Sequence, residues 1–137
     1  MSGAPDCRPD LDIVTVRPRE GVMTLQRLPY FVGVSGGTCG AKSLSMNMVV
    51  IPAGGAAEPH YHRGYETAIY IVKGRVLTKY GEGLKREIVN EEGDFVFIPP
   101  GLPHQPVNLS ATESALAIVA RNDPGETENV VPYDPHA

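Results

Sequence analysis

The sequence lacks the features typical of membrane-spanning proteins, of proteins that bind anionic membrane surfaces, and of nucleic-acid-binding proteins. It contains no apolar run long enough to cross a membrane. Its Lys and Arg residues are scattered from Arg8 to Arg121 without forming a basic stripe, and the net charge is −4. These absences weigh against an anionic membrane surface or a nucleic acid as the partner, and they leave a small molecule as the expected one.

Cysteines are scarce as well. Cys7 stands in a polar N-terminal arm and Cys39 in a glycine-rich loop. Two isolated cysteines and no hydrophobic leader are typical of a protein whose thiols stay reduced. We therefore expect a cytoplasmic location.

A convincing helix is also missing, because no window shows the i, i+3, i+4 apolar spacing. Instead, 15 glycines and 13 prolines separate many short β-rich segments. Strands are expected over residues 11–16, 31–34, 43–51, 67–73, 75–80, 85–89, 94–98 and 114–121. Such a series predicts an all-β protein, either a sandwich or a small β-barrel.

The length of 137 residues fits one domain with a core of its own. Within a single domain 1–137, we expect residues 1–10 to form a loose arm and residues of about 43–121 to form the barrel core. Residues 122–137 are expected to be a tail, either a final edge strand or frayed. His136 in this tail is predicted to be exposed rather than a ligand.

What the sequence does contain is a group of histidines with a glutamate. His60, His62 and Glu66 follow the pattern His-x-His-x3-Glu, and His104 comes later in the chain. On one extended strand the first three would share a face, because side chains alternate with a period of two. Neutral imidazole suits zinc, copper, iron and nickel, and a carboxylate extends the range to manganese. The pattern therefore predicts a metal site.

The alternative is that these are surface histidines in a loop. Against it stands the second segment, residues 93–108. There a strand and a rigid turn from Pro99 to Gly101 deliver His104 at a defined place. The metal site is the interpretation we favour.

The two segments resemble the two sequence motifs of the cupin superfamily. In addition, residues 60–70 and 120–124 look like those of small single-domain bacterial cupins. The residues that match the first motif, Gly-x5-His-x-His-x3,4-Glu-x6-Gly, are Gly54, His60, His62, Glu66 and Gly74. Those that match the second motif, Gly-x5-Pro-x-Gly-x2-His-x3-Asn, are Gly93, Pro99, Gly101, His104 and Asn108. The resemblance implies a double-stranded β-helix, the jelly-roll or cupin barrel, with a mononuclear centre of three histidines and one glutamate.

One spacing departs from the first motif, because seven residues instead of six separate Glu66 from Gly74. A slip of one residue reverses the face of a strand, so a bulge or a longer turn must lie nearby. If the extra residue follows Glu66, its carboxylate stays in the site. If it lies in the Arg63-Gly64-Tyr65 turn, Thr67 takes the position. We favour Glu66 as the ligand.

Inward neighbours of the site should share the even parity of the ligands. This parity nominates Met46, Met48, Tyr70, Val72, Val96 and Ile98. The aliphatic ones are most simply core residues. A buried tyrosine hydroxyl needs a partner, and a substrate oxygen or a metal-bound water would serve. We therefore name Tyr70 with Glu66 as the predicted catalytic residues.

The predicted cofactor is one divalent ion of iron, manganese, nickel or zinc. Three neutral imidazoles and one carboxylate would leave it with about one net positive charge and open coordination positions. Such a centre attracts bidentate anions, for example enediolates, catecholates and 2-oxo acids. The substrate is therefore expected to be a small anionic molecule.

The function favoured by this reasoning is an oxidoreductase of the dioxygenase type that acts on a small organic acid or enol. The cupin resemblance supports this class, because it implies dioxygenases and decarboxylases with a centre of three histidines and one glutamate. Two alternatives stay open: a sugar or sugar-phosphate isomerase, and a ligand-binding cupin without turnover. An open sheet edge would also favour a homodimer.

Overall fold

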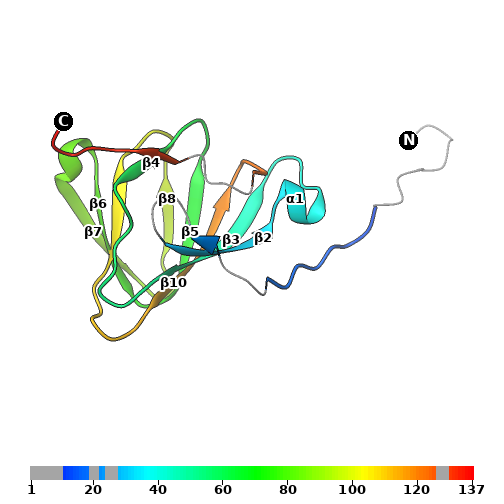
Figure 1. The fold of residues 1–137 in the computed structure, drawn as a ribbon, viewed down its shortest axis with the longest axis horizontal. Coiled ribbons are helices and arrows are strands. Elements are labelled where there is room, and N and C mark those ends of the chain that lie inside the picture. Colours follow the sequence, from blue (N-terminus) through cyan, green and yellow to red (C-terminus); the bar gives the residue numbers. More distant parts are fainter. Residues whose placement is uncertain (1–10, 19–21, 24–27, 126–129) are drawn as a thin grey trace.

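The computed structural model describes residues 11–18, 22–23, 28–125 and 130–137, and within them it contains eleven β-strands. They form two antiparallel sheets that face each other (Figure 1). The six-stranded sheet has the order β1 (Val22–Met23), β2 (Pro29–Val34), β3 (Ser45–Ile51), β10 (Ala115–Arg121), β5 (Thr67–Lys73) and β8 (Phe95–Ile98). The five-stranded sheet has the order β11 (Val130–Pro132), β4 (His60–His62), β9 (His104–Asn108), β6 (Arg75–Tyr80) and β7 (Arg86–Glu91).

This architecture confirms the predicted all-β jelly-roll. Most predicted strands are present, and the structure adds β1, β4, β9 and, in the tail, β11. Residues 11–18 are the exception, because they form no strand and run away from the two sheets in Figure 1. The arm predicted for residues 1–10, with Cys7, lies outside the described residues, and Cys39 is a free thiol.

Among the described residues, helical structure is confined to two short pieces, α1 (Gly36–Cys39) and the 3-10 turn η1 (Glu82–Leu84). α1 begins at Ser35, whose side chain accepts a hydrogen bond from the backbone N–H of Thr38. A helix of one turn has no apolar periodicity, so the sequence pattern could not indicate it. No helix in the described ranges is long and apolar enough to span a membrane.

The inner faces of the two sheets enclose the core. On β10 every second residue from Ala115 to Arg121 is buried, which is the alternation expected of a strand with one face inward. The core cluster consists of Leu28, Tyr30, Val49, Ile51, Ala57, Ile71, Val76, Ala115, Ala117 and Val119.

The inward parity predicted for β3 and β5 was wrong. Odd-numbered residues face the interior, while Met46 and Tyr70 are 49% and 38% exposed. On β3 the buried polar Asn47 accepts a hydrogen bond from the backbone N–H of Gly33 and contacts the hydroxyl of Tyr30. Because these partners satisfy its amide, the polar side chain can lie inside and the methionine outside. On β8 the prediction was right, since Val96 and Ile98 line the interior.

Two motif residues hold the barrel together. Gly74 joins β5 to β6, and a Cβ atom there would lie 2.9 Å from the Cβ of Ala115 at a φ of +95°. Only glycine fits this turn, where the chain passes from one sheet to the other. The buried amide of Asn108 donates to the carbonyls of Ile51, Pro52 and Glu113 at 2.8–3.2 Å. Both residues therefore maintain the fold rather than take part in chemistry.

Candidate metal centre

Three imidazoles meet inside the barrel. β4 carries His60 and His62 on its inner face, and β9 begins at His104, the direct cross-strand partner of His60. All three are at most 4% exposed. The ring centroid of His60 lies 4.9 Å from that of His62 and 4.4 Å from that of His104. The nitrogen atoms that could bind a metal all lie within 4.8 Å of one another.

The second nitrogen of each ring has a fixed partner. Nδ1 of His60 lies 2.6 Å from the carbonyl oxygen of Glu58, and Nδ1 of His104 lies 2.9 Å from that of Leu102. A carbonyl oxygen can only accept, so both Nδ1 atoms carry the proton and Nε2 holds the lone pair. Nδ1 of His62 lies 2.9 Å from the hydroxyl of Tyr65, which can donate or accept, and this contact leaves Nε2 of His62 facing away from Tyr65.

Burial keeps the rings of His60 and His104 neutral. Loss of solvent lowers the pKa of His60, with the positive charge of Arg121 acting in the same direction. For His104, burial first and then repulsion by His60 and Arg121 lower the pKa to about 4. At neutral pH these two imidazoles are therefore unprotonated, which is the form that binds a metal.

Glu66 does not join the histidines, which corrects the prediction. Glu66 is exposed, and its backbone N–H donates to the side chain of Asn122 at 2.8 Å. The turn after β4 contains Gly64, which has a φ of +84°. After this turn β5 begins with Thr67 facing inward, 2% exposed. The position that the motif gives to a carboxylate holds a hydroxyl instead.

Tyr70 does not reach the centre either. It lies on the outer face of β5, where its ring packs 4.8 Å from that of Phe95. The same turn explains this result, because a change of parity before β5 reverses the face of every later residue in that strand. The catalytic roles predicted for Glu66 and Tyr70 thus have no support in the geometry.

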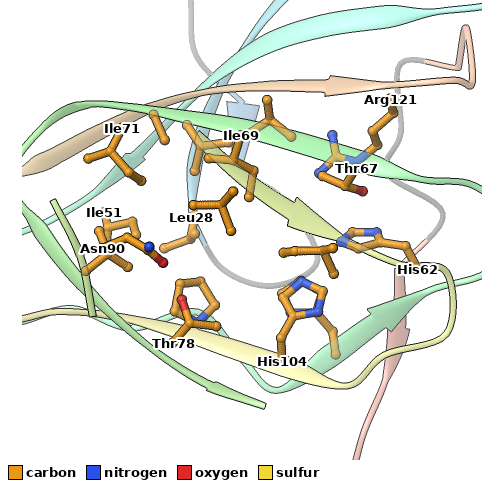
Figure 2. Close-up of a pocket in the computed structure, with 18 residues that line it drawn as sticks. Leu28, Ile51, His62, Thr67, Ile69, Ile71, Thr78, Asn90, His104 and Arg121 are labelled. Atoms are coloured by element: carbon orange, nitrogen blue, oxygen red, sulfur yellow. The ribbon is translucent and has the colours of Figure 1, made fainter. Parts of the chain in front are cut away.

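A cavity of about 80 Å³ adjoins the histidines (Figure 2). His62, His104, Thr67 and Arg121 lie at one end in this view, and Ile51, Ile71, Thr78 and Asn90 lie at the other. The lining residues are Leu28, Val49, Ile51, His60, His62, Thr67, Ile69, Ile71, Val76, Thr78, Asn90, Val96, Ile98, His104, Pro106, Ala117, Val119 and Arg121. Most of the wall is apolar, and this described set includes no carboxylate.

Sequence reasoning missed Arg121 and Tyr65, and it gave Thr67 only as the alternative to Glu66. Arg121 ends β10, is 7% exposed, and pairs in register with Thr67 of β5. The alternation of β10, in which odd-numbered residues are buried, was the signal that could have placed Arg121 inside. No pattern in the sequence indicates that Tyr65 holds His62.

Together, the fold and the site define a class: a jelly-roll barrel with a buried three-histidine cluster suited to a divalent metal ion. The chain belongs to the cupin family, since the family model described as Cupin domain matches residues 47–120. The superfamily indicated by the two motifs is thereby confirmed.

Several known proteins are similar to this chain. Germin-like protein subfamily T member 3 of Arabidopsis thaliana is 34% identical over 83 residues, which are 58% of this chain and 36% of that protein. The oxalate decarboxylase of Lactobacillus farciminis, in a formate complex, superimposes with a TM-score of 0.67 at 20% identity, over 85% of this chain and 33% of the other. This chain thus spans about a third of each.

The polyketide cyclase RemF of Streptomyces resistomycificus has a TM-score of 0.65 at 21% identity, over 87% of this chain and 77% of the other. The oxalate decarboxylase of Bacillus subtilis, which has Mn(II) centres, has a TM-score of 0.69 at 16% identity, over 83% and 30%. At such identities these structures establish the fold alone.

Proposed function

We propose that this cupin binds one divalent metal ion through His60, His62 and His104. We further propose that it acts as an oxidoreductase of the dioxygenase type on a small organic acid or enol. The observation that carries the proposal is the buried cluster of three imidazoles whose Nδ1 atoms are engaged by other groups. Nε2 is then the donor atom of each ring, and small rotations would bring the three to a common ion.

The donor set fits a first-row metal. Neutral imidazole nitrogens suit iron, nickel, zinc and, less strongly, manganese. A redox-active ion held there would supply oxygen chemistry, whereas zinc would only polarise a carbonyl or activate water. The comparison with a manganese-containing oxalate decarboxylase supports a divalent ion without identifying it.

The residues around the centre have separate tasks. Glu58 and Leu102 fix two imidazoles through their backbone carbonyls, and Tyr65 fixes the third. The apolar wall formed by residues such as Ile69 and Ile98 excludes bulk water from the reacting end of a substrate. This chain therefore orients the metal ligands and shields the substrate.

The size of the cavity weighs against a sugar-phosphate isomerase. A water molecule needs roughly 10–15 Å³ of such volume. The cavity of about 80 Å³ thus has room for roughly five to eight water molecules. A ligand with a similar number of non-hydrogen atoms fits, and a hexose phosphate is about twice as large.

Metal analysis of the purified protein tests the proposal. Wild type grown with iron, manganese, nickel and zinc should retain about one metal ion per chain. His104→Ala should lose it, and His136→Ala, which changes an exposed histidine of the tail, should not. Bound iron or manganese, with oxygen consumption when 2-oxo acids are added, would support the oxidoreductase. Full metal content in His104→Ala would refute the centre.

A ligand-binding cupin without turnover is the second candidate. The observation in its favour is that the lining residues described above contain no carboxylate, lysine or cysteine to act as an acid or base. Metal retention and ligand binding without oxygen consumption or any change in the ligand would identify this case.

We also propose that the protein forms a homodimer. An apolar row crosses the outer face of the six-stranded sheet in register, formed by Phe31, Met48, Ile118, Tyr70 and Phe95. At its end the edge strand β8 leaves Phe95 and Phe97 84% and 61% exposed. An exposed apolar sheet face of this extent is typical of a protein–protein interface, and a second copy would cover it.

A further inference from the structure

We propose that Arg121 and Thr67 bind the carboxylate of a small organic acid and hold it beside the three histidines, with its apolar body directed along the cavity. This inference extends the proposed function to a substrate class. The carboxylate contact itself depends only on side chains of this chain, so it can be measured with and without metal.

The first observation is a buried positive charge. Arg121 is 7% exposed and lines the cavity together with the histidines. Figure 2 shows its side chain at the histidine end, next to Thr67, its register partner. Two of its nitrogen atoms, Nε and Nη1, are buried and make no hydrogen bond within the described part of the chain, so they can donate to a ligand. A planar guanidinium matches a carboxylate because it can donate two parallel hydrogen bonds.

The second observation concerns Thr67. Its Oγ1 atom is buried and, in the part of the chain that the structure describes, has no hydrogen-bond partner. Thr67 also lines the cavity. A buried hydroxyl is normally satisfied, so this one indicates a missing ligand or water in the adjoining space. A carboxylate oxygen held by Arg121 would accept its proton.

Charge balance points the same way. With Glu66 on the outer surface, three neutral imidazoles would leave a divalent ion with its full charge of about +2. Arg121 adds one more positive charge at the same end of the cavity. An anionic ligand would reduce the charge on the ion, as the usual glutamate of the motif would have done.

The other residues of the cavity wall determine the size and polarity of the ligand body that fits beside the carboxylate. Beyond the histidine end, the cavity is lined mainly by aliphatic side chains such as Val49, Ile51, Ile71 and Val119. Its volume of about 80 Å³ admits only a short chain of carbon atoms. The geometry thus favours a small monocarboxylate or 2-oxo acid with an aliphatic body over a sugar or a polyanion.

Two probes of matched size separate charge from shape. Isobutyrate and isobutyramide differ in the carboxylate alone and should be titrated into the protein by ligand-observed NMR, first after metal removal and then with bound metal. The wild type should bind isobutyrate about tenfold more tightly than the amide, because hydrogen bonds between charged groups are the stronger ones.

Substitutions of Arg121 and Thr67 test whether these side chains contact the carboxylate. Arg121→Met should lower the affinity for isobutyrate by about tenfold or more, and Arg121→Lys should restore part of it because the charge remains. Thr67→Val, which keeps the shape, should lower it about threefold to tenfold. Arg75→Met is the matched control, since it removes an exposed arginine of β6 outside the cavity and should change nothing. Thermal unfolding followed by circular dichroism verifies that each variant is folded.

Equal binding of the acid and the amide by wild type would overturn the inference. So would unchanged affinity in folded Thr67→Val together with either Arg121 variant. These outcomes are distinct from failure of the proposed metal centre. If the protein holds no metal but Arg121→Lys and Thr67→Val weaken isobutyrate binding as stated, the carboxylate site stands and the oxidoreductase does not.

Discussion

Protonation of His104 provides a quantitative test of the buried site. The unfolded chain takes up this proton near pH 6.5, whereas burial and the neighbouring positive charges lower the pKa in the folded state to about 4. As the pH falls, the unfolded state is therefore protonated first. The free energy of unfolding should decrease from about pH 6.5 downward, and this contribution should level off below about pH 4.

The magnitude follows from the difference between the two pKa values. Each pH unit between them changes the free energy of unfolding by about 1.4 kcal/mol. For His104 alone, the loss between about pH 7.5 and about pH 5 amounts to about 2 kcal/mol. Burial also lowers the pKa of His60, which adds to the loss in the same direction.

Urea unfolding of protein freed of metal with a chelator measures this effect. The chain has no tryptophan, so circular dichroism is the suitable signal. His104→Leu removes the titrating group, and its loss of stability over the same pH range should be smaller by about 2 kcal/mol. His136→Leu is the control, because it changes an exposed histidine, and it should behave as wild type. An equal loss in His104→Leu and wild type would refute the buried, neutral imidazole.

Three further predictions concern the wall and the outer surface. Glu66→Gln should keep the metal content of wild type because Glu66 is exposed. Loss of metal in this variant would show that Glu66 is a ligand after all. Thr67→Glu should bind divalent metal about tenfold more tightly, since it places a carboxylate at the cavity wall; a competition titration with a chelator measures the change, and weaker binding would contradict it. Phe97→Glu should be a monomer by light scattering while Ile88→Glu, on the other sheet, stays a dimer; a wild-type monomer would end the homodimer proposal.

The strands and the histidines could be predicted because they depend on local spacing. β5 and β6 lie where the β-rich segments on either side of Gly74 predicted them. His60 and His62 share a face because extended backbone repeats every two residues. The sequence also indicated that a turn near Glu66 was one residue longer than the motif requires.

Contacts between residues far apart in the chain decided which face of β5 points inward, a question that the residue spacing left open. Asn122 binds the backbone of Glu66 across 56 residues, and this contact helps to fix where the turn ends and β5 begins. As a result Thr67 faces the cavity and Tyr70 faces away. The pattern of a single strand cannot show which of two alternating faces the rest of the chain will cover.

By itself, the sequence determined a β-barrel family and the identity of three imidazole donors, because both follow from residue type and short spacing. Only the tertiary structure decided that the fourth wall position is a hydroxyl and that Arg121 stands beside it. The physical reason is that β5 and β10 pair through hydrogen bonds between strands more than 40 residues apart in the chain, and Thr67 and Arg121 are one of these pairs.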